Sequence, residues 1–246
     1  MFDSQVILLR KRVFRENDYL LTFFTQHEGK KTLLGRGMQN MSSKLAPHCA
    51  DFFVVSRIRW VPGKSFDTIT SATAEQSMDG ISTELLRIGV GFQVLESLDR
   101  WTRDDNPEPQ LWNAVMTVLQ QISTSASPWL VVQAFFVRAL ALLGWKLQLD
   151  RCLVCQSPVT AGARLNISAG GVWCTQQHGV ASATAISQND INILKYLQSD
   201  QWNTVSTDQV KPLLPIIRES IDLHRERPWS SDQWVSWVGR HVYARA

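Results

Sequence analysis

The sequence predicts an α+β protein, in which an N-terminal five-stranded β-barrel of the OB type is followed by an α-helical domain with an inserted zinc-knuckle-like loop. Three observations lead to this fold class. Residues 5–75 contain short runs of β-branched and aromatic residues, the hydrophobic period then changes to that of helices, and cysteines and glycines gather in residues 146–180. We therefore predict a barrel domain at 1–77 and a helical domain at 78–246, interrupted by the loop 146–180.

Five runs in the first domain predict its strands. Turn-forming stretches such as "RENDY", "QHEGK" and "VPGKS" separate them, and they span residues 5–12, 20–26, 30–37, 50–60 and 66–73. In the fourth run, Val54, Ser56, Ile58 and Trp60 alternate with Val55, Arg57 and Arg59, so we expect one mixed apolar face and one basic face. Proline 47 limits the stretch before this strand to a short helical turn. Five strands with an insertion after the third are typical of a small closed barrel.

Helical periodicity begins near residue 80. Apolar residues at three-and-four spacing run from Leu85 to Leu98, and a second helix is predicted at 110–123. The stretch 128–145 is apolar on all sides, which predicts a buried helix that begins at Pro128. Helical patterns return after the cysteine-containing loop, at residues 187–198, 207–226 and 230–242. Ser187 and Ser230 are the expected N-caps of the first and last of these.

Positive charge is concentrated in the predicted barrel. Residues 1–75 carry eleven Lys and Arg against seven Asp and Glu, a balance of +4, whereas residues 76–246 carry fourteen against fifteen, a balance of −1. This asymmetry favours an anionic partner for the barrel. Cationic side chains on a barrel face can bind nucleic-acid phosphates and release counterions. The candidates for such DNA contacts are Arg10, Lys11, Arg12, Arg15, Lys30, Lys31, Arg36, Lys44, Arg57 and Arg59, together with Lys64. The alternative is an ordinary solvated surface of charged side chains.

Aromatic residues of the same segment are candidates for stacking on nucleobases, an interaction worth about 1–3 kcal/mol per base. They are Phe14, Tyr19, Phe52, Phe53, Trp60 and Phe66. Most of them must fill the barrel, so we expect only one or two to face solvent.

Three of the four cysteines fall within residues 152–174, in a pattern that resembles a zinc knuckle. Cys152 and Cys155 have C-x-x-C spacing, and Cys174 with His178 has C-x-x-x-H spacing, whereas Gln177 stands where a second C-x-x-C would place its last cysteine. Thiolates and imidazole are the ligands that Zn²⁺ prefers, and an amide oxygen is a weak substitute. We predict a structural Zn²⁺ site formed by Cys152, Cys155, Cys174 and His178. The alternative is a relic in which the cysteines are merely buried.

The remaining sequence features argue against an enzyme and against a secreted or membrane-spanning chain. A G-x-S-x-G elbow, a phosphate-binding G-x-x-x-x-G-K-[ST] loop and an H-E-x-x-H helix are all missing. A Cys–His nucleophile pair at His48–Cys49 and an acid–base pair at Asp104–Asp105 stay open as weak alternatives. The first residues lack the basic region of a secretory signal, and the apolar stretch 129–145 is too short to span a bilayer. We expect a soluble cytoplasmic protein in a reducing compartment.

The order of these features, together with local phrases, resembles the RecO family of bacterial recombination mediators. The phrases are "VILLRKRVFRENDYLLTFFTQHEGKKTLLGRGM", "SSKLAPHCADFFVV", "AFFVRALALLGW" leading to "LDRCLVC", and "IDLHRERPWSSDQW". The sequence departs from the family at Gln177 and in "RPWSSDQW", where many members have a Lys-Ser pair. The likeness implies a non-catalytic, nucleoid-associated protein that binds single- and double-stranded DNA and anneals complementary strands.

The same resemblance implies protein partners. RecO proteins contact single-strand-binding protein and act with RecR to load RecA onto coated single strands. They bind the acidic, Phe-ending tail of single-strand-binding protein on the helical domain, and Arg138 is our candidate cation for that peptide. The alternative for Arg138 is a pairing with a carboxylate inside the helical bundle. The alternative for the whole protein is an interaction scaffold whose degenerate barrel no longer binds DNA.

Overall fold

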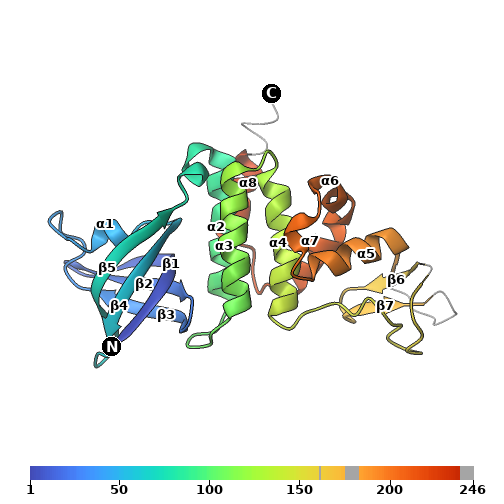
Figure 1. Ribbon diagram of the computed structural model, residues 1–246, viewed down its shortest axis with the longest axis horizontal. Coiled ribbons are helices and arrows are strands. Elements are labelled where there is room, and N and C mark those ends of the chain that lie inside the picture. Colours follow the sequence, from blue (N-terminus) through green and yellow to red (C-terminus); the bar gives the residue numbers. More distant parts are fainter. Residues whose placement is uncertain (161, 175–182, 239–246) are drawn as a thin grey trace. The chain divides into compact units, whose positions relative to one another are not determined.

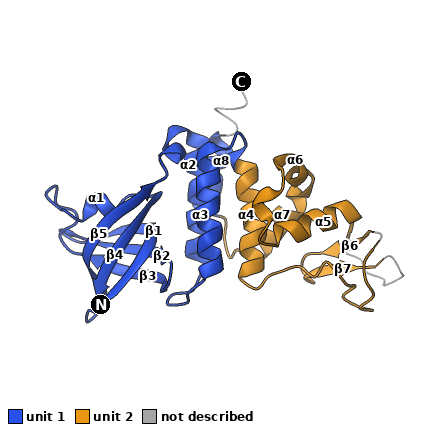
Figure 2. Ribbon diagram, in the orientation of Figure 1, with its two compact units in different colours: residues 1–128, 229–246 blue, residues 129–228 orange. Residues whose placement is uncertain are grey.

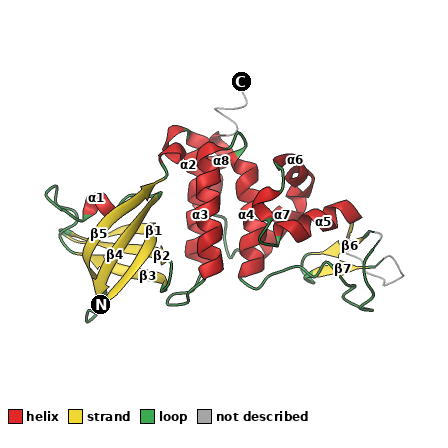
Figure 3. Ribbon diagram, in the orientation of Figure 1, coloured by secondary structure: helices red, strands yellow, loops and turns green. Residues whose placement is uncertain are grey.

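The computed structural model confirms the predicted fold class. It describes residues 1–160, 162–174 and 183–238. The N-terminal strands form a closed barrel and a helical region follows (Figures 1 and 3). Contacts divide the chain into two compact units, residues 1–128 with 229–246 and residues 129–228 (Figure 2). The first unit therefore holds helices as well as the barrel, and the predicted domain boundary at residue 77 stays a prediction.

The barrel has the strand order β1-β2-β3-β5-β4 and closes where β4 pairs with β1. All neighbouring strands are antiparallel except β3 and β5, which are parallel. This is the five-stranded order expected of the OB type, and each predicted strand is present, with its ends shifted by a few residues. The strands are β1 (Phe2–Arg15), β2 (Asp18–Thr25), β3 (Gly29–Gly35), β4 (Val54–Val61) and β5 (Asp67–Ser77).

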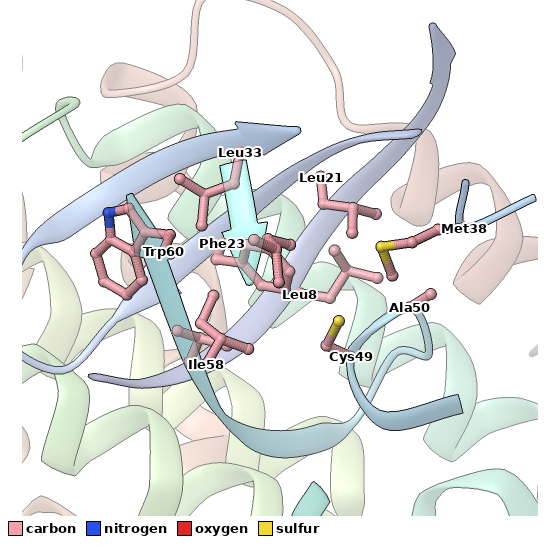
Figure 4. Packing of buried hydrophobic residues seen from close by; sticks show 11 residues of the cluster. Leu8, Leu21, Phe23, Leu33, Met38, Cys49, Ala50, Ile58 and Trp60 are labelled. Carbon is pink, nitrogen blue, oxygen red and sulfur yellow. The ribbon is translucent and has the colours of Figure 1, made fainter. Parts of the chain in front are cut away.

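Alternate residues of the strands fill the barrel (Figure 4). Leu21 and Phe23 of β2 point inward with Ile58 and Trp60 of β4, and all four are buried. The connection between β3 and β4 adds Met38, Cys49 and Ala50 to this core. Burial of each large side chain contributes roughly 1.5–3 kcal/mol. The connection contains only one helical turn, α1 (Ala46–Cys49), with a proline in its first turn as predicted.

In the part of the chain that the structure describes, three longer helices belong to the same unit as the barrel. They are α2 (Leu85–Trp101), α3 (Pro109–Thr124) and α8 (Ser230–Val238), and a short 3₁₀ turn, η1 (Asp79–Thr83), leads into α2. Helix α2 packs on β1, α3 and α8. The prediction that Ser230 caps α8 is wrong, because Ser230 is the first helical residue. The carboxylate of Glu96 in α2 accepts the Ser230 and Ser231 backbone N–H groups, at 3.1 and 3.0 Å, and so caps α8 from outside.

The second unit contains the remaining helices and a small sheet. Its helix α4 (Pro128–Leu142) is buried at every residue from 132 to 140, as the apolar pattern predicts. Ser187 caps α5 (Gln188–Leu197) by accepting a hydrogen bond from the Asp190 N–H, which confirms that prediction. The pattern at 207–226 folds as α6 (Thr207–Val210), η3 (Lys211–Leu213) and α7 (Leu214–Leu223), because prolines interrupt it, and η2 (Trp202–Thr204) precedes them.

The loop predicted at 146–180 is more regular than its sequence indicates. Strands β6 (Ala163–Asn166) and β7 (Gly171–Trp173) form a hairpin, and β8 (Thr184–Ile186) pairs with the other edge of β6. In the part of the chain that the structure describes, no helix is both long enough and apolar enough to cross a membrane.

Candidate nucleic-acid interface and metal centre

Six of the predicted cations lie in or beside the β1–β2 hairpin, the β3–β4 connection and the β4–β5 loop. We call the region formed by these three segments the hairpin end. All six side chains are exposed. Among the residues that the structure describes, no carboxylate oxygen lies within 4.0 Å of their charged nitrogens. The six are Lys11, Arg12, Arg15, Arg36, Lys44 and Lys64.

Hydrogen bonds fix the segments of the hairpin end to one another. The Gln39 side-chain amide donates to the carbonyl oxygens of Arg15 and Asp18, at 2.7 and 2.8 Å, which ties the β3–β4 connection to the hairpin. The Asp18 carboxylate accepts the Gly37 N–H at 2.8 Å, and this carboxylate is therefore used inside the fold. The Lys11 ammonium donates to the Ala50 carbonyl at 3.0 Å, beyond α1. Arg36 and Lys44 thus lie in a connection that is anchored to the hairpin on both sides.

Two half-buried aromatic rings complete the hairpin end. Phe14 of β1 and Phe66 of the β4–β5 loop meet edge to face, with ring centroids 5.5 Å apart, and they bring Lys64 to the hairpin. The Arg15 guanidinium lies 5.1 Å from the centroid of the Phe14 ring. Cations with aromatic rings between them can hold both phosphates and bases of a single strand.

The other aromatic candidates serve packing. Trp60 is fully buried, and Phe53 is 6% exposed. Phe52 and Phe53 both pack edge to face on Phe92 of α2, at 5.0 Å between centroids. Tyr19 packs against the barrel core beneath the Lys11 ammonium.

Three further predicted cations face α2 and the loop after it. The Lys30 side chain is only 13% exposed, and its ammonium donates to the carbonyl oxygens of Asp99 and Thr102, at 2.8 and 2.9 Å. These carbonyls belong to the carboxyl end of α2, where a cation is favoured by the helix dipole. Arg10 lies 3.7 Å from the Asp99 carboxylate, and Lys31 pairs with Asp105.

The last two predicted cations are held by carboxylates on the outside of the barrel. Arg57 donates to Asp3 at 3.1 Å and to Glu75 at 2.6 Å, and Arg59 donates to Asp3 at 2.7 Å. The alternation predicted for β4 is confirmed from Ser56 to Trp60, where Ser56, Ile58 and Trp60 are buried and both arginines are exposed. It is wrong at Val55, which was expected on the basic face but is buried, because a register shift separates it from Ser56. The basic face of this strand nevertheless carries no net charge once the two carboxylates are counted.

Neither weak enzyme alternative gains support from the geometry. Burial raises the pKa of the Cys49 thiol to about 12, and the nearby Asp51 carboxylate adds to this effect. A thiol that stays protonated is not a nucleophile at neutral pH. Asp104 and Asp105 pair with Lys30 and Lys31 instead of with each other.

Three of the four predicted metal ligands come together. The Sγ atoms of Cys152, Cys155 and Cys174 lie within 4.8 Å of one another, close enough to bind one metal ion. The Cys155 and Cys174 sulfurs are 3.7 Å apart, much farther than the about 2.05 Å of a disulfide bond. The predicted fourth ligand, His178, and Gln177 beside it lie outside the described residues.

Backbone hydrogen bonds hold the three cysteines close together. The Leu153 N–H donates to the Val172 carbonyl at 2.9 Å, so the C-x-x-C turn is held against β7, which leads directly to Cys174. The Val154 N–H donates to the Cys152 sulfur at 3.4 Å. Burial raises the pKa of the Cys152 thiol, but hydrogen bonds from the backbone N–H groups of Cys155, Cys174 and Val154 outweigh burial and lower it overall. These bonds favour the thiolate, the form that binds metals.

Arg138 is buried in α4. One guanidinium nitrogen donates to the Gln198 carbonyl at 2.7 Å, at the carboxyl end of α5, and another pairs with Asp200. A neighbouring apolar cavity, lined in part by Leu140 and Gln198, has a volume of only about 20 Å³, which is room for about one water molecule. These contacts agree with the alternative interpretation of Arg138, in which it pairs with a carboxylate within the helical bundle. Its role in peptide binding stays a prediction.

Sequence reasoning did not identify the partners of these cations. Asp3, Glu75 and Asp99 are far in sequence from the arginines and lysines that they contact. Strand register places Asp3 opposite Arg59 and Gln5 opposite Arg57, and the sequence contains no signal for that register. The carboxyl end of α2 likewise reaches Lys30 only through the packing of α2 beside the barrel.

Comparison with known proteins covers almost the whole chain. A family model described as "Recombination protein O N terminal" matches residues 1–78, and one described as "Recombination protein O C terminal" matches residues 82–233. The DNA repair protein RecO of Moorella thermoacetica is 27% identical over 251 aligned residues, which cover 97% of this chain and 92% of the relative. The RecO protein of Desulfitobacterium hafniense is 26% identical, with 98% and 92% covered. That of Dehalococcoides mccartyi is 24% identical, with 83% and 81% covered.

Proposed function

Because the chain belongs to the recombination protein O family, we propose that it is a non-catalytic, DNA-binding mediator of recombinational repair. It binds single- and double-stranded DNA through the hairpin end of its barrel and anneals complementary strands. Its relatives carry the name DNA repair protein RecO. The observation that carries the proposal is that six exposed cations of the hairpin end have no described carboxylate oxygen within 4.0 Å, beside the half-buried Phe14–Phe66 pair.

The proposed contacts allow the barrel to bind both single- and double-stranded DNA. Phosphates of either form lie against the exposed cations, which position the nucleic acid without reading its sequence. Only an unpaired base can stack on Phe14 or Phe66, so single strands gain an additional contact. Binding that is independent of sequence, with a preference for unpaired bases, is what an annealing protein needs when it holds one strand for another.

Salt dependence of single-strand binding tests this function. Each phosphate contact changes the slope of log K against log salt by about −0.7 for a single strand, so six contacts give a slope of about −4. Fluorescence anisotropy with a labelled oligonucleotide at several salt concentrations measures it. Affinity that is absent, or that does not change with salt, would favour the scaffold alternative, in which the helical region binds proteins and the barrel binds no DNA.

We also propose that the three cysteines bind a structural Zn²⁺ ion. In a tetrahedral zinc site with Zn–S bonds of about 2.3 Å, neighbouring sulfurs lie about 3.8 Å apart, and the 3.7 Å between Cys155 and Cys174 agrees with this. Soft thiolates select zinc over harder ions. The ion would hold the C-x-x-C turn against β7, in the segment 150–158, where Cys152 is the one buried residue. His178 remains the proposed fourth ligand.

The proposed partners follow from family membership. They are RecR, single-strand-binding protein and, indirectly, RecA, and the proposed site of action is the cytoplasm, in association with the nucleoid. The barrel supports the DNA part of this role, because the six cations of its hairpin end are exposed. A strand-annealing assay on DNA coated with single-strand-binding protein, with and without RecR, measures whether these partners are used. Annealing that needs bare DNA would contradict the mediator role.

A further inference from the structure

The outer face of β1, β4 and β5 carries a chain of three ion pairs and one further hydrogen bond, which we call the paired face. Its members are Asp3 and Gln5 of β1, Arg57 and Arg59 of β4, and Glu75 of β5. In the antiparallel register, Asp3 lies opposite Arg59 and Gln5 lies opposite Arg57. Each arginine therefore has a polar side chain of β1 directly across from it. Cross-strand pairs of opposite charge stabilise a sheet by a few tenths of a kcal/mol or more.

Each carboxylate oxygen of the paired face has its own donor. The two oxygens of Asp3 accept from Arg57 at 3.1 Å and from Arg59 at 2.7 Å. Those of Glu75 accept from Arg57 and from the Gln5 amide, both at 2.6 Å. The hydrogen bonds from Arg59 and then Arg57 lower the pKa of Asp3, and those from Gln5 and then Arg57 lower the pKa of Glu75. Both carboxyl groups therefore stay ionised at neutral pH.

This arrangement changes what the two arginines can offer to a polyanion. A cation binds phosphate favourably because it releases a counterion that was condensed on the nucleic acid. Arg57 binds its carboxylates through Nε and one terminal nitrogen, and Arg59 through Nε, so other N–H groups of both can still reach a phosphate. A phosphate bound there would lie beside the ionised carboxylates of Asp3 and Glu75, which repel it and cancel the attraction of the arginines. The hairpin end has no such cost, because no described carboxylate lies within 4.0 Å of its cations.

We propose that Asp3 and Glu75 are specificity-determining residues that exclude nucleic acid from the paired face and confine it to the hairpin end. This inference rests on the proposed function, since it assumes that the barrel binds DNA. It assigns the two carboxylates a role beyond sheet stability. They make one wall of a basic barrel electrostatically neutral, and a single strand therefore has one path instead of two.

Removal of both carboxylate charges tests the inference. In the variant with Asp3→Asn and Glu75→Gln, the arginines become available to phosphates while the side-chain shapes are kept. Two additional contacts make the slope of log K against log salt steeper by about 1.4, and they raise single-strand affinity at about 0.1 M salt by a factor of up to about 25. The control variant, Asp208→Asn with Glu219→Gln, makes the same change in net charge on exposed helical positions of the second unit. It should leave the slope unchanged.

A second pair of variants keeps the test decisive. Replacement of Arg57 and Arg59 by glutamine in the native background should change single-strand affinity by less than about twofold, whereas the same replacement of Arg12 and Arg15 should lower it by up to about 25-fold. Equal losses from the two pairs, or no gain when the carboxylates are neutralised, would overturn the inference. A native protein whose affinity does not respond to salt would overturn the proposed function instead.

Discussion

The position of Lys30 in the basic segment predicts that it binds DNA, but its contacts indicate a structural role. Its ammonium is nearly buried and donates two hydrogen bonds to carbonyls at the carboxyl end of α2. Lys30→Met keeps the aliphatic stem but removes both bonds and the favourable charge at the helix end. Hydrogen bonds to charged groups contribute about 1.5–3 kcal/mol each, and the methionine avoids the cost of burying an ammonium. We therefore expect a net loss of about 2–3 kcal/mol in the free energy of unfolding.

Thermal unfolding followed by circular dichroism measures this loss. For a chain of this size, it corresponds to a decrease in Tm of about 4–12 °C. Lys31→Met is a matched control, because the neighbouring lysine pairs with the exposed carboxylate of Asp105 and such pairs contribute about 0–1 kcal/mol. Equal Tm values for the two variants would refute the capping role. A loss of DNA affinity in folded Lys30→Met, as large as that from Arg12 or Arg15, would also contradict the reasoning.

Three further predictions concern the metal site, pH and base stacking. Cys174→Ala should lower the zinc content from about one ion per chain to none, as measured by atomic emission, whereas Cys49→Ala should not change it; zinc-free native protein would contradict the site. Burial lowers the pKa of His224 from 6.5, so its neutral form adds stability above pH 6.5, and this stability is lost as pH falls through the folded-state pKa. Tm should therefore decrease between pH 7 and pH 5 by more in the native protein than in His224→Gln, and parallel decreases would refute the assignment. Phe66→Ala should weaken single-strand binding at least about fivefold and duplex binding much less, while Phe2→Ala, which removes a ring stacked on Trp60 at the start of β1, should change neither; equal losses for both DNA forms would argue against stacking.

Local patterns predicted the parts of the fold that depend on local chemistry. Period-two alternation located β4, three-and-four spacing located α2, and the serine at 187 was identified correctly as a cap. The predicted family is also confirmed by the two family models. In each case the deciding interactions are repeated along a short stretch of chain, so the sequence itself carries the signal.

Other features depend on contacts between distant segments and were not predictable. The pairing of Arg57 and Arg59 with Asp3 requires the β1–β4 register, and the capping of α8 by Glu96 joins residues more than 130 positions apart. Strands β6 and β8 are too short to show an alternating pattern. For the metal site, the cysteine pattern predicted that Cys152, Cys155 and Cys174 share one ion, and their sulfurs do lie together, while the role of His178 stays a prediction.

The central claim is that nucleic acid binds the hairpin end of the barrel. The most direct test compares the salt dependence of single-strand binding between the native protein and a variant in which Arg12, Arg15 and Arg36 are replaced by glutamine. We expect the slope of log K against log salt to change from about −4 to about −2, since three of six phosphate contacts are lost. An unchanged slope in a folded variant would show that DNA binds elsewhere and would contradict the account.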